Sequence, residues 1–156
     1  MATILLQSVL SALACAAFSI VFNAPRRELA WCGLNGGLGW FVYALITAKN
    51  GRPVSATLAA AAAVTIVARL LSYHRQAPST LYHIPGILPL VPGMAVYNAM
   101  QAAIGGFILE TYSNALLALK LAGAIGVGSI LILILPYSFF EFIPRREKKT
   151  ASGKKA

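Results

Sequence analysis

Residues 84–93, with the sequence IPGILPLVPG, carry three prolines and two glycines inside an otherwise apolar segment. Proline has no backbone N–H and glycine loosens a helix, so a helix built through this segment is interrupted. Irregular backbone at membrane depth persists only where protein or a water-filled cavity shields it, and broken helices are where many transporters bind their substrate. We therefore expect a broken membrane helix here, with functional residues beside it.

The chain has 156 residues, of which 58% are hydrophobic and 11% charged. Soluble domains carry about 25% charged residues, so this composition is typical of a membrane protein. Segments long and apolar enough to cross a bilayer are predicted at residues 3–22, 29–48, 54–73, 81–109 and 115–142, with a short polar break at 110–114. We predict an all-α integral membrane protein with about five transmembrane helices, the fourth broken by proline and glycine. Because alanine side chains are small, the alanine-rich third segment forms a thin helix, and we expect it at the centre of the helix bundle.

The basic residues are placed like a topology signal and not like a nucleic-acid-binding surface. The formal net charge is +9, and six of the 13 Lys and Arg residues lie in residues 145–155. Cytoplasmic loops collect Lys and Arg, so we expect five crossings with this tail in the cytoplasm. The inside group is then Arg26, Arg27, Arg69, Arg75 and the six tail residues, and the outside group is Lys49, Arg52 and Lys120. A re-entrant fourth segment fits the charges almost as well.

Two parts are expected along the chain: a transmembrane helical domain over residues 1–143 and a basic, disordered cytoplasmic tail over residues 144–156. The first 24 residues contain no Lys or Arg, so we interpret them as a retained first span and not as a signal peptide. Arg69 lies about one turn from the end of the third span, where its side chain is expected to snorkel to the headgroups. The expected location is the plasma (inner) membrane.

The residues needed for enzymatic chemistry are scarce. The chain has no aspartate, and its acidic residues lie near or beyond the ends of the predicted spans: Glu28, Glu110, Glu141 and Glu147. His74 and His83 have no further ligand type at metal-binding spacing, and Cys15 and Cys32 lie inside apolar segments. We predict no catalytic residue, no metal and no cofactor.

Several polar and small residues stand out within the spans. Gly33 and Gly37 form a small-xxx-small pair that favours close helix packing. Asn35 lies between them and is expected either to make an interhelical hydrogen bond or to line a permeation path. Tyr97 and Gln101 are four residues apart and share a helix face after the break.

A helix that restarts after Pro92 and Gly93 points its free N–H groups into the break, which favours binding of a carboxylate. The candidate substrate path therefore comprises Pro89, Pro92, Gly93 and Tyr97, with Asn35 and Gln101. The alternative is a kinked structural helix whose glycines serve packing alone.

Two motifs resemble those of the threonine/serine exporter family. Residues 22–33, FNAPRRELAWCG, resemble that family's F-N-x-P-x-x-x-L-x-W-C signature after the first helix. Residues 87–100, ILPLVPGMAVYNAM, are similar to its I-x-P-x-x-P-G-x-x-x-Y-x-A-M stretch. The chain resembles the small membrane subunit of split, two-component members, which corresponds to the second half of the longer exporters.

The resemblance implies a membrane subunit of a secondary exporter for small carboxylate solutes, either threonine and serine or a dicarboxylate such as succinate. It also implies a partner membrane subunit with the other exporter half, and an oligomeric assembly in the lipid bilayer. The alternative is a membrane scaffold that stabilises a partner transporter subunit without transporting.

Overall fold

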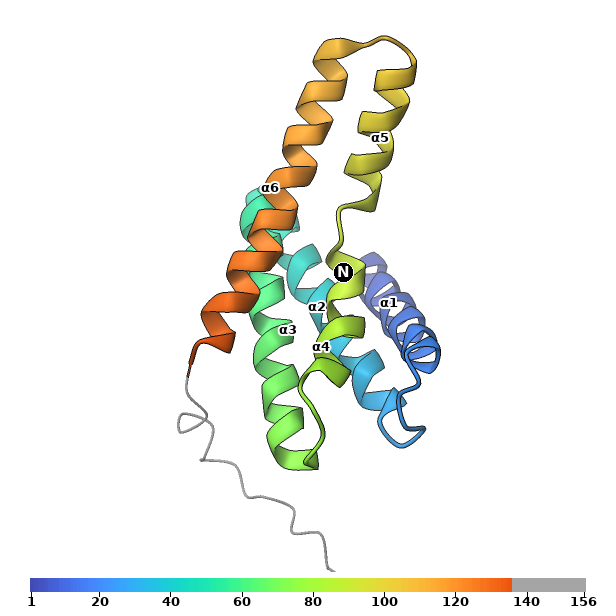
Figure 1. The fold of residues 1–156 in the computed structure, drawn as a ribbon, viewed down its shortest axis with the longest axis vertical. Helices are drawn as coiled ribbons and strands as arrows, with labels where there is room; N and C mark the ends of the chain where they lie inside the picture. Colours follow the sequence, from blue (N-terminus) through green and yellow to red (C-terminus); the bar gives the residue numbers. More distant parts are fainter. Residues whose placement is uncertain (136–156) are drawn as a thin grey trace, which may run out of the picture.

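The structure is a computed structural model that describes residues 1–135, and every regular element in this range is a helix (Figure 1). The elements are α1 (Ala2–Val21), α2 (Leu29–Asn50), α3 (Pro53–Arg75), α4 (Thr80–Ile87), the short 3-10 helix η1 (Leu88–Leu90), α5 (Gly93–Ile104) and α6 (Ile108–Leu133). The end of the predicted fifth span and the predicted tail lie outside the described residues.

Four of these helices, α1, α2, α3 and α6, are long and apolar enough to cross a membrane. The segment Thr80–Leu90 and α5 form a fifth candidate, bent by 46° at the break between them. Because the bend is well below a reversal, α5 continues in the general direction of α4, as in a broken crossing (Figure 1). The predicted fold class, with about five spans and a broken fourth, is confirmed.

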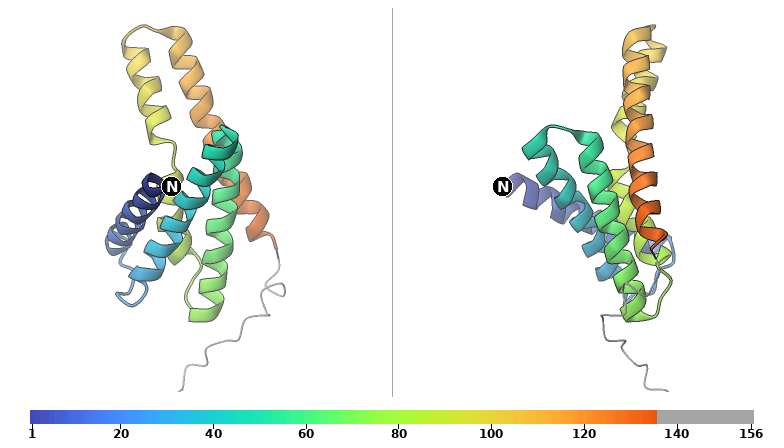
Figure 2. Two further views of the ribbon diagram at one scale, coloured as in Figure 1. Left: turned by 180° about the vertical axis from the view of Figure 1, so that it is seen from behind. Right: turned by 90° about the vertical axis from the view of Figure 1, so that its left-hand side faces the viewer.

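Helix α3 lies between α2 and α6 and also contacts α4, while α1 packs along α2 (Figures 1 and 2). The buried face of α3 consists largely of small residues, among them Ala56, Ala60 and Ala68. Small side chains let neighbouring backbones approach closely, which is the usual way helices associate in membranes. The α5–α6 hairpin extends beyond the ends of α2 and α3 (Figure 2).

Glycines of α2 make the contact with α1 possible. A Cβ atom at Gly33 would lie 2.8 Å from the carbonyl oxygen of Ala12, and one at Gly37 would lie 2.9 Å from the Ala12 Cβ. A Cβ at Gly36 would lie 2.1 Å from the Cys15 sulfur. The glycine face of α2 is therefore in direct contact with the backbone and side chains of α1.

The expected polar break at residues 110–114 is wrong. The chain turns earlier, at residues 105–107, where Gly106 adopts a φ of 76° that favours glycine. The polar residues that follow belong to the first turns of α6, because their side chains bond to the helix itself. Thr111 Oγ1 donates to the carbonyl of Phe107, and Asn114 Nδ2 donates to the carbonyl of Glu110.

Arg69 was expected to extend its side chain outward to the headgroups, but it is buried within the bundle. Its residue is only 5% exposed, and its guanidinium donates to the carbonyls of Ile132 and Leu135 at the end of α6. The last carbonyls of a helix have no partner within the helix and carry the negative end of its dipole. Arg69 thus joins α3 to the end of α6.

We expect Gly128→Ala to destabilise the bundle by about 1–3 kcal/mol, because overpacking forces the backbones apart. A Cβ at Gly128 would lie 2.6 Å from the Leu58 carbonyl oxygen of α3. The matched control is Gly126→Ala on the same helix, where a Cβ meets nothing within 4 Å. Thermal unfolding of both variants in detergent should separate them, and equal melting temperatures would contradict this packing.

Candidate functional site

The break in the fourth crossing is shorter than the predicted segment 84–93. Residues 84–87 are still helical, with Pro85 inside α4, and the irregular backbone is confined to Val91 and Pro92. Val91 is extended, with φ −59° and ψ 130°, and Pro92 has φ −77° and ψ 54°. Since proline cannot donate to a carbonyl in the preceding turn, Pro92 ends one helix and lets the next begin at Gly93.

Helix α2 supplies side-chain donors to carbonyls of α4 and α3. Pro85 has no N–H for the carbonyl of Leu81, four residues earlier, and the Cys32 thiol approaches that carbonyl at 3.4 Å. One turn further along α2, Asn35 Nδ2 donates to the carbonyls of Tyr82 at 3.1 Å and Val64 at 3.3 Å. Backbone groups in the membrane need such partners, so Cys32 and Asn35 fix α4 against the bundle.

A cavity of about 410 Å³ lies at the break, which is within the range of small-molecule sites. Both ends of the break contribute to its wall, from η1 through the first turn of α5, and the opposite wall comes from α2, α3 and α6. Its polar lining outside the break consists of Trp40, Tyr43, Thr57, Asn98 and Asn114. The cavity therefore combines apolar walls with a few hydrogen-bonding groups.

The start of α5 brings backbone donors to this cavity. The Gly93 N–H bonds to the Val91 carbonyl at 2.8 Å, and the Val96 N–H bonds to the Pro92 carbonyl at 3.1 Å. Within residues 1–135 this leaves the amides of Met94 and Ala95 without a backbone acceptor. Both residues line the cavity, at the positive end of the α5 dipole.

A second cavity, of about 390 Å³, lies further along the α5–α6 hairpin. Asn98 and Asn114 line both cavities, so the two are adjacent. The second cavity is more polar, and its lining consists of Asn98, Gln101, Ala102, Phe107, Glu110 and Asn114.

The structure brings together only some of the predicted path residues. Pro89, Pro92 and Gly93 line the first cavity, and Gln101 lines the second. Tyr97 is 58% exposed and lines neither of them. Asn35 is buried at the α2–α4 contact, where it makes the interhelical hydrogen bonds that were its alternative role.

Asn114, Thr57 and Asn98 line the first cavity but were not among the predicted path residues. Asn98 could have been found, because it directly follows Tyr97 after the break. Asn114 was assigned to a polar turn and therefore not to a helix face. Nothing in the alanine-rich sequence around Thr57 indicates that it faces a cavity.

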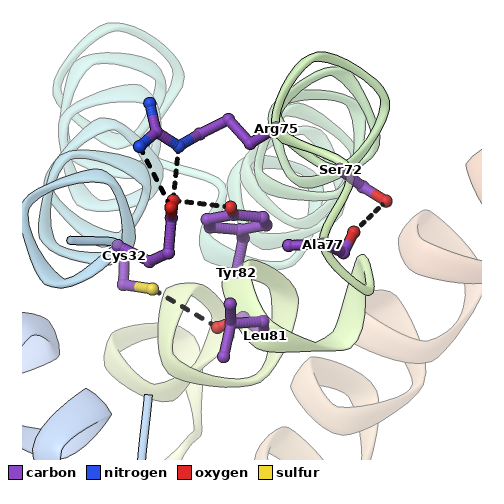
Figure 3. A network of polar contacts seen from close by, with 7 residues as sticks. Cys32, Ser72, Arg75, Ala77, Leu81 and Tyr82 are labelled. Carbon is purple, nitrogen blue, oxygen red and sulfur yellow. Dashed lines mark hydrogen bonds and ion pairs between the residues drawn. The ribbon is translucent and has the colours of Figure 1, made fainter. Parts of the chain in front are cut away.

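The other end of the bundle is held by a network of polar contacts (Figure 3). Arg75 at the end of α3 forms an ion pair with Glu28, just before α2, and its guanidinium lies 5.3 Å from the Trp31 ring centre. The Tyr82 hydroxyl on α4 donates to the same Glu28 carboxylate at 2.7 Å. Three helices are thus joined at this end, about 18 Å along α2 from Trp40 of the cavity.

Two opposing effects act on the pKa of Glu28. Burial raises it, but the hydrogen bonds from Arg75 and Tyr82, together with the charge of Arg75, outweigh burial and hold the pKa below its ordinary value. The network therefore favours the charged carboxylate.

Membrane-length helices around a cavity at a broken crossing form the architecture of a membrane transport protein. The family model described as "Threonine/Serine exporter, ThrE" matches residues 7–135. The chain belongs to this family, which consists of transporters and not of enzymes, and the predicted family resemblance is confirmed.

Two named relatives agree. The chain is 34% identical over 132 residues to "Probable threonine/serine exporter" of Mycobacterium tuberculosis, covering 81% of this chain and 25% of the relative. It is 33% identical over 116 residues to "Threonine/serine exporter" of Corynebacterium glutamicum, covering 74% of this chain and 24% of the relative. The chain therefore spans about a quarter of the length of these relatives. No solved structure matches it.

We expect Glu28→Gln to make Cys32 more reactive toward maleimide, because the network then no longer holds α4 against α2. Both cysteines are buried, with exposures of 0% for Cys32 and 1% for Cys15. Cys15 packs against Gly36 and serves as the control within the same molecule. Mass spectrometry of the labelled peptides measures each rate, and an unchanged Cys32 rate in the variant would contradict this role of the network.

The same network predicts a pH dependence of stability. Because the folded-state pKa of Glu28 is below its ordinary value of 4.5, its contribution is fully present above about pH 4.5 and is lost as the pH falls through the folded-state pKa. The melting temperature in detergent should fall over this acidic range. The fall should be smaller in Glu28→Gln, and identical profiles would show that Glu28 does not contribute.

Proposed function

We propose that this chain is the membrane subunit of a secondary exporter of small carboxylate solutes, and that the cavity at the broken crossing is part of the solute path. The solutes are threonine and serine, or a dicarboxylate such as succinate. A partner membrane subunit carries the other half of the exporter, and the two form an oligomeric assembly in the plasma (inner) membrane. The basic tail after residue 143 lies in the cytoplasm.

The observation that carries this proposal is the cavity of about 410 Å³ lined from both sides of the break. Irregular backbone at membrane depth persists only where protein or a water-filled cavity shields it, and here the break lines a cavity. This supports a solute site at the break. The donor groups at the start of α5 suit a carboxylate, which threonine, serine and succinate share.

The names of the relatives support threonine and serine as solutes. The partner subunit is supported by the length comparison, since the chain spans about a quarter of each relative. The cytoplasmic tail is supported by the six basic residues within residues 145–155, because cytoplasmic segments collect Lys and Arg.

The second candidate function is a scaffold that stabilises a partner transporter without forming the path. Apolar side chains that remain exposed on α1, among them Leu5, Leu6 and Leu13, favour this candidate, because they offer a partner helix a surface outside the cavity. A transporting partner that needs this chain only for its own stability would support it.

Gly93→Leu tests the path directly. Gly93 lines the cavity, and a Cβ there meets nothing within 4 Å, so a side chain can begin at this position without a clash. We expect it to lower solute flux about tenfold, since filling a close-fitting path with an isobutyl group costs on the order of 1–3 kcal/mol. Flux of labelled threonine, serine and succinate is measured in vesicles that contain the full chain and its partner subunit.

The matched control is Gly123→Leu on α6, where a Cβ also meets nothing within 4 Å and which does not line the cavity. This variant should transport like the parent. Equal flux in both variants would count against the path and for the scaffold.

A further inference from the structure

The second cavity lies between two polar helix faces. Asn98 and Gln101 are three residues apart on α5, and Glu110 and Asn114 are four residues apart on α6, so each pair lies on one face of its helix. The two helices form a hairpin and run side by side (Figure 1). These four side chains, exposed except for the half-buried Asn114, line one cavity along the inner seam of the hairpin.

The surroundings of this seam are apolar. Near the tip of the hairpin Ile104 is 88% exposed, Ile108 84% and Leu109 82%. Glu110 itself is exposed and lies in the first turn of α6, so its carboxylate is open to a ligand that enters the cavity. Among residues 1–135 no side chain donates to the Glu110 carboxylate. A single acidic group in this position is therefore a candidate for contact with a cationic group of a ligand.

The groups beside Glu110 suit an ammonium group. Asn114 uses its Nδ2 to donate to the main-chain carbonyl of Glu110 at 2.9 Å, which leaves its Oδ1 as an acceptor. The amides of Asn98 and Gln101 provide further oxygens on the opposite wall. One carboxylate and three amide oxygens around a cavity can accept the three N–H bonds of a primary ammonium.

The second cavity lies next to the cavity at the break. It shares Asn98 and Asn114 with the cavity at the break, where the N–H groups at the start of α5 suit a carboxylate. Gly93 and Gln101 are about 12 Å apart along α5. The ammonium and carboxylate of an amino acid are attached to one carbon, so they meet these two places in turn and not at once.

We propose that the cavity around Glu110 binds the ammonium group of the solute, and that Glu110 selects amino acids over dicarboxylates. This proposal rests on the proposed function of the adjacent cavity. A dicarboxylate would bring a second negative charge toward Glu110 and be repelled, whereas an amino acid brings a positive one.

Three related compounds separate the two recognition elements. Threonine has both charged groups, threonine amide has the ammonium alone, and 3-hydroxybutanoate has the carboxylate alone. Binding of each to the purified full chain in nanodiscs is measured at constant ionic strength by the rise in melting temperature with concentration. In Glu110→Gln we expect the affinity for threonine and threonine amide to fall roughly three- to tenfold, with that for 3-hydroxybutanoate unchanged.

Glu110→Asp keeps the charge and should retain most of the affinity for threonine amide, which excludes a purely structural effect of the substitution. An unchanged affinity of Glu110→Gln for threonine amide, or an equal loss for 3-hydroxybutanoate, would overturn the proposal. Because binding is measured without transport, this outcome is distinct from a failure of the exporter function. If the unaltered protein transports threonine but Glu110→Gln binds threonine amide with unchanged affinity, the exporter function stands and the role of Glu110 is excluded.

Discussion

Each proline in the fourth crossing removes a backbone N–H, and the carbonyl that loses this donor needs another partner inside the membrane. The rest of the structure depends on which groups serve as those partners. At Pro85 the replacement is the Cys32 thiol of α2, which approaches the Leu81 carbonyl, and Asn35 adds a second bond from α2, to the carbonyl of Tyr82. These contacts allow α4 to stay helical and buried despite its proline. At Pro92 the helix does end, and a cavity lies beside it. The segment from α4 to α5 thus contains two interruptions. At Pro85 a side chain of α2 takes the place of the missing donor, and at Pro92 the helix ends beside the cavity.

The two halves of the broken crossing are consequently held very differently. Helix α4 is joined to α2 and α3 by the Glu28 network and by a contact of 3.1 Å between His83 Nε2 and Thr65 Oγ1. Helix α5 packs mainly on α6, and Met94 and Met100 at its surface are 71% and 64% exposed. Movement of α5 relative to α4 would therefore concentrate at Val91 and Pro92, whereas α6 is held to α3 by close packing and by Arg69. Since Val91 and Pro92 line the cavity, such movement would change its shape directly.

Local sequence patterns predicted the helices, the close packing of small residues and the family, because these follow from hydropathy, Gly and Pro. Side-chain partners distant in sequence could not be predicted in the same way. Arg69 was predicted to contact the lipid headgroups, but its hydrogen-bond acceptors are carbonyls more than sixty residues further along the sequence. Asn114 looked like part of a turn, because Thr, Ser and Asn favour turns, yet each can also bond to its own helix. The turn lies instead at Gly106. The polar residues after it therefore belong to α6, where Glu110 and Asn114 form part of the polar seam.

The polar seam of the α5–α6 hairpin also bears on what covers it. Amides and a carboxylate facing a cavity can persist in a bilayer only where protein or water, and not lipid, closes the open side. The hairpin extends beyond α2 and α3 (Figure 2). Asn98, Gln101 and Glu110 are exposed, so this chain alone does not enclose the cavity that they line. The relatives are about four times as long as the matched part, so additional protein is available in them to do so. Lipid can cover the exposed apolar surface, whereas the polar cavity needs water or additional protein, so of these two surfaces only the cavity bears on the proposed partner subunit.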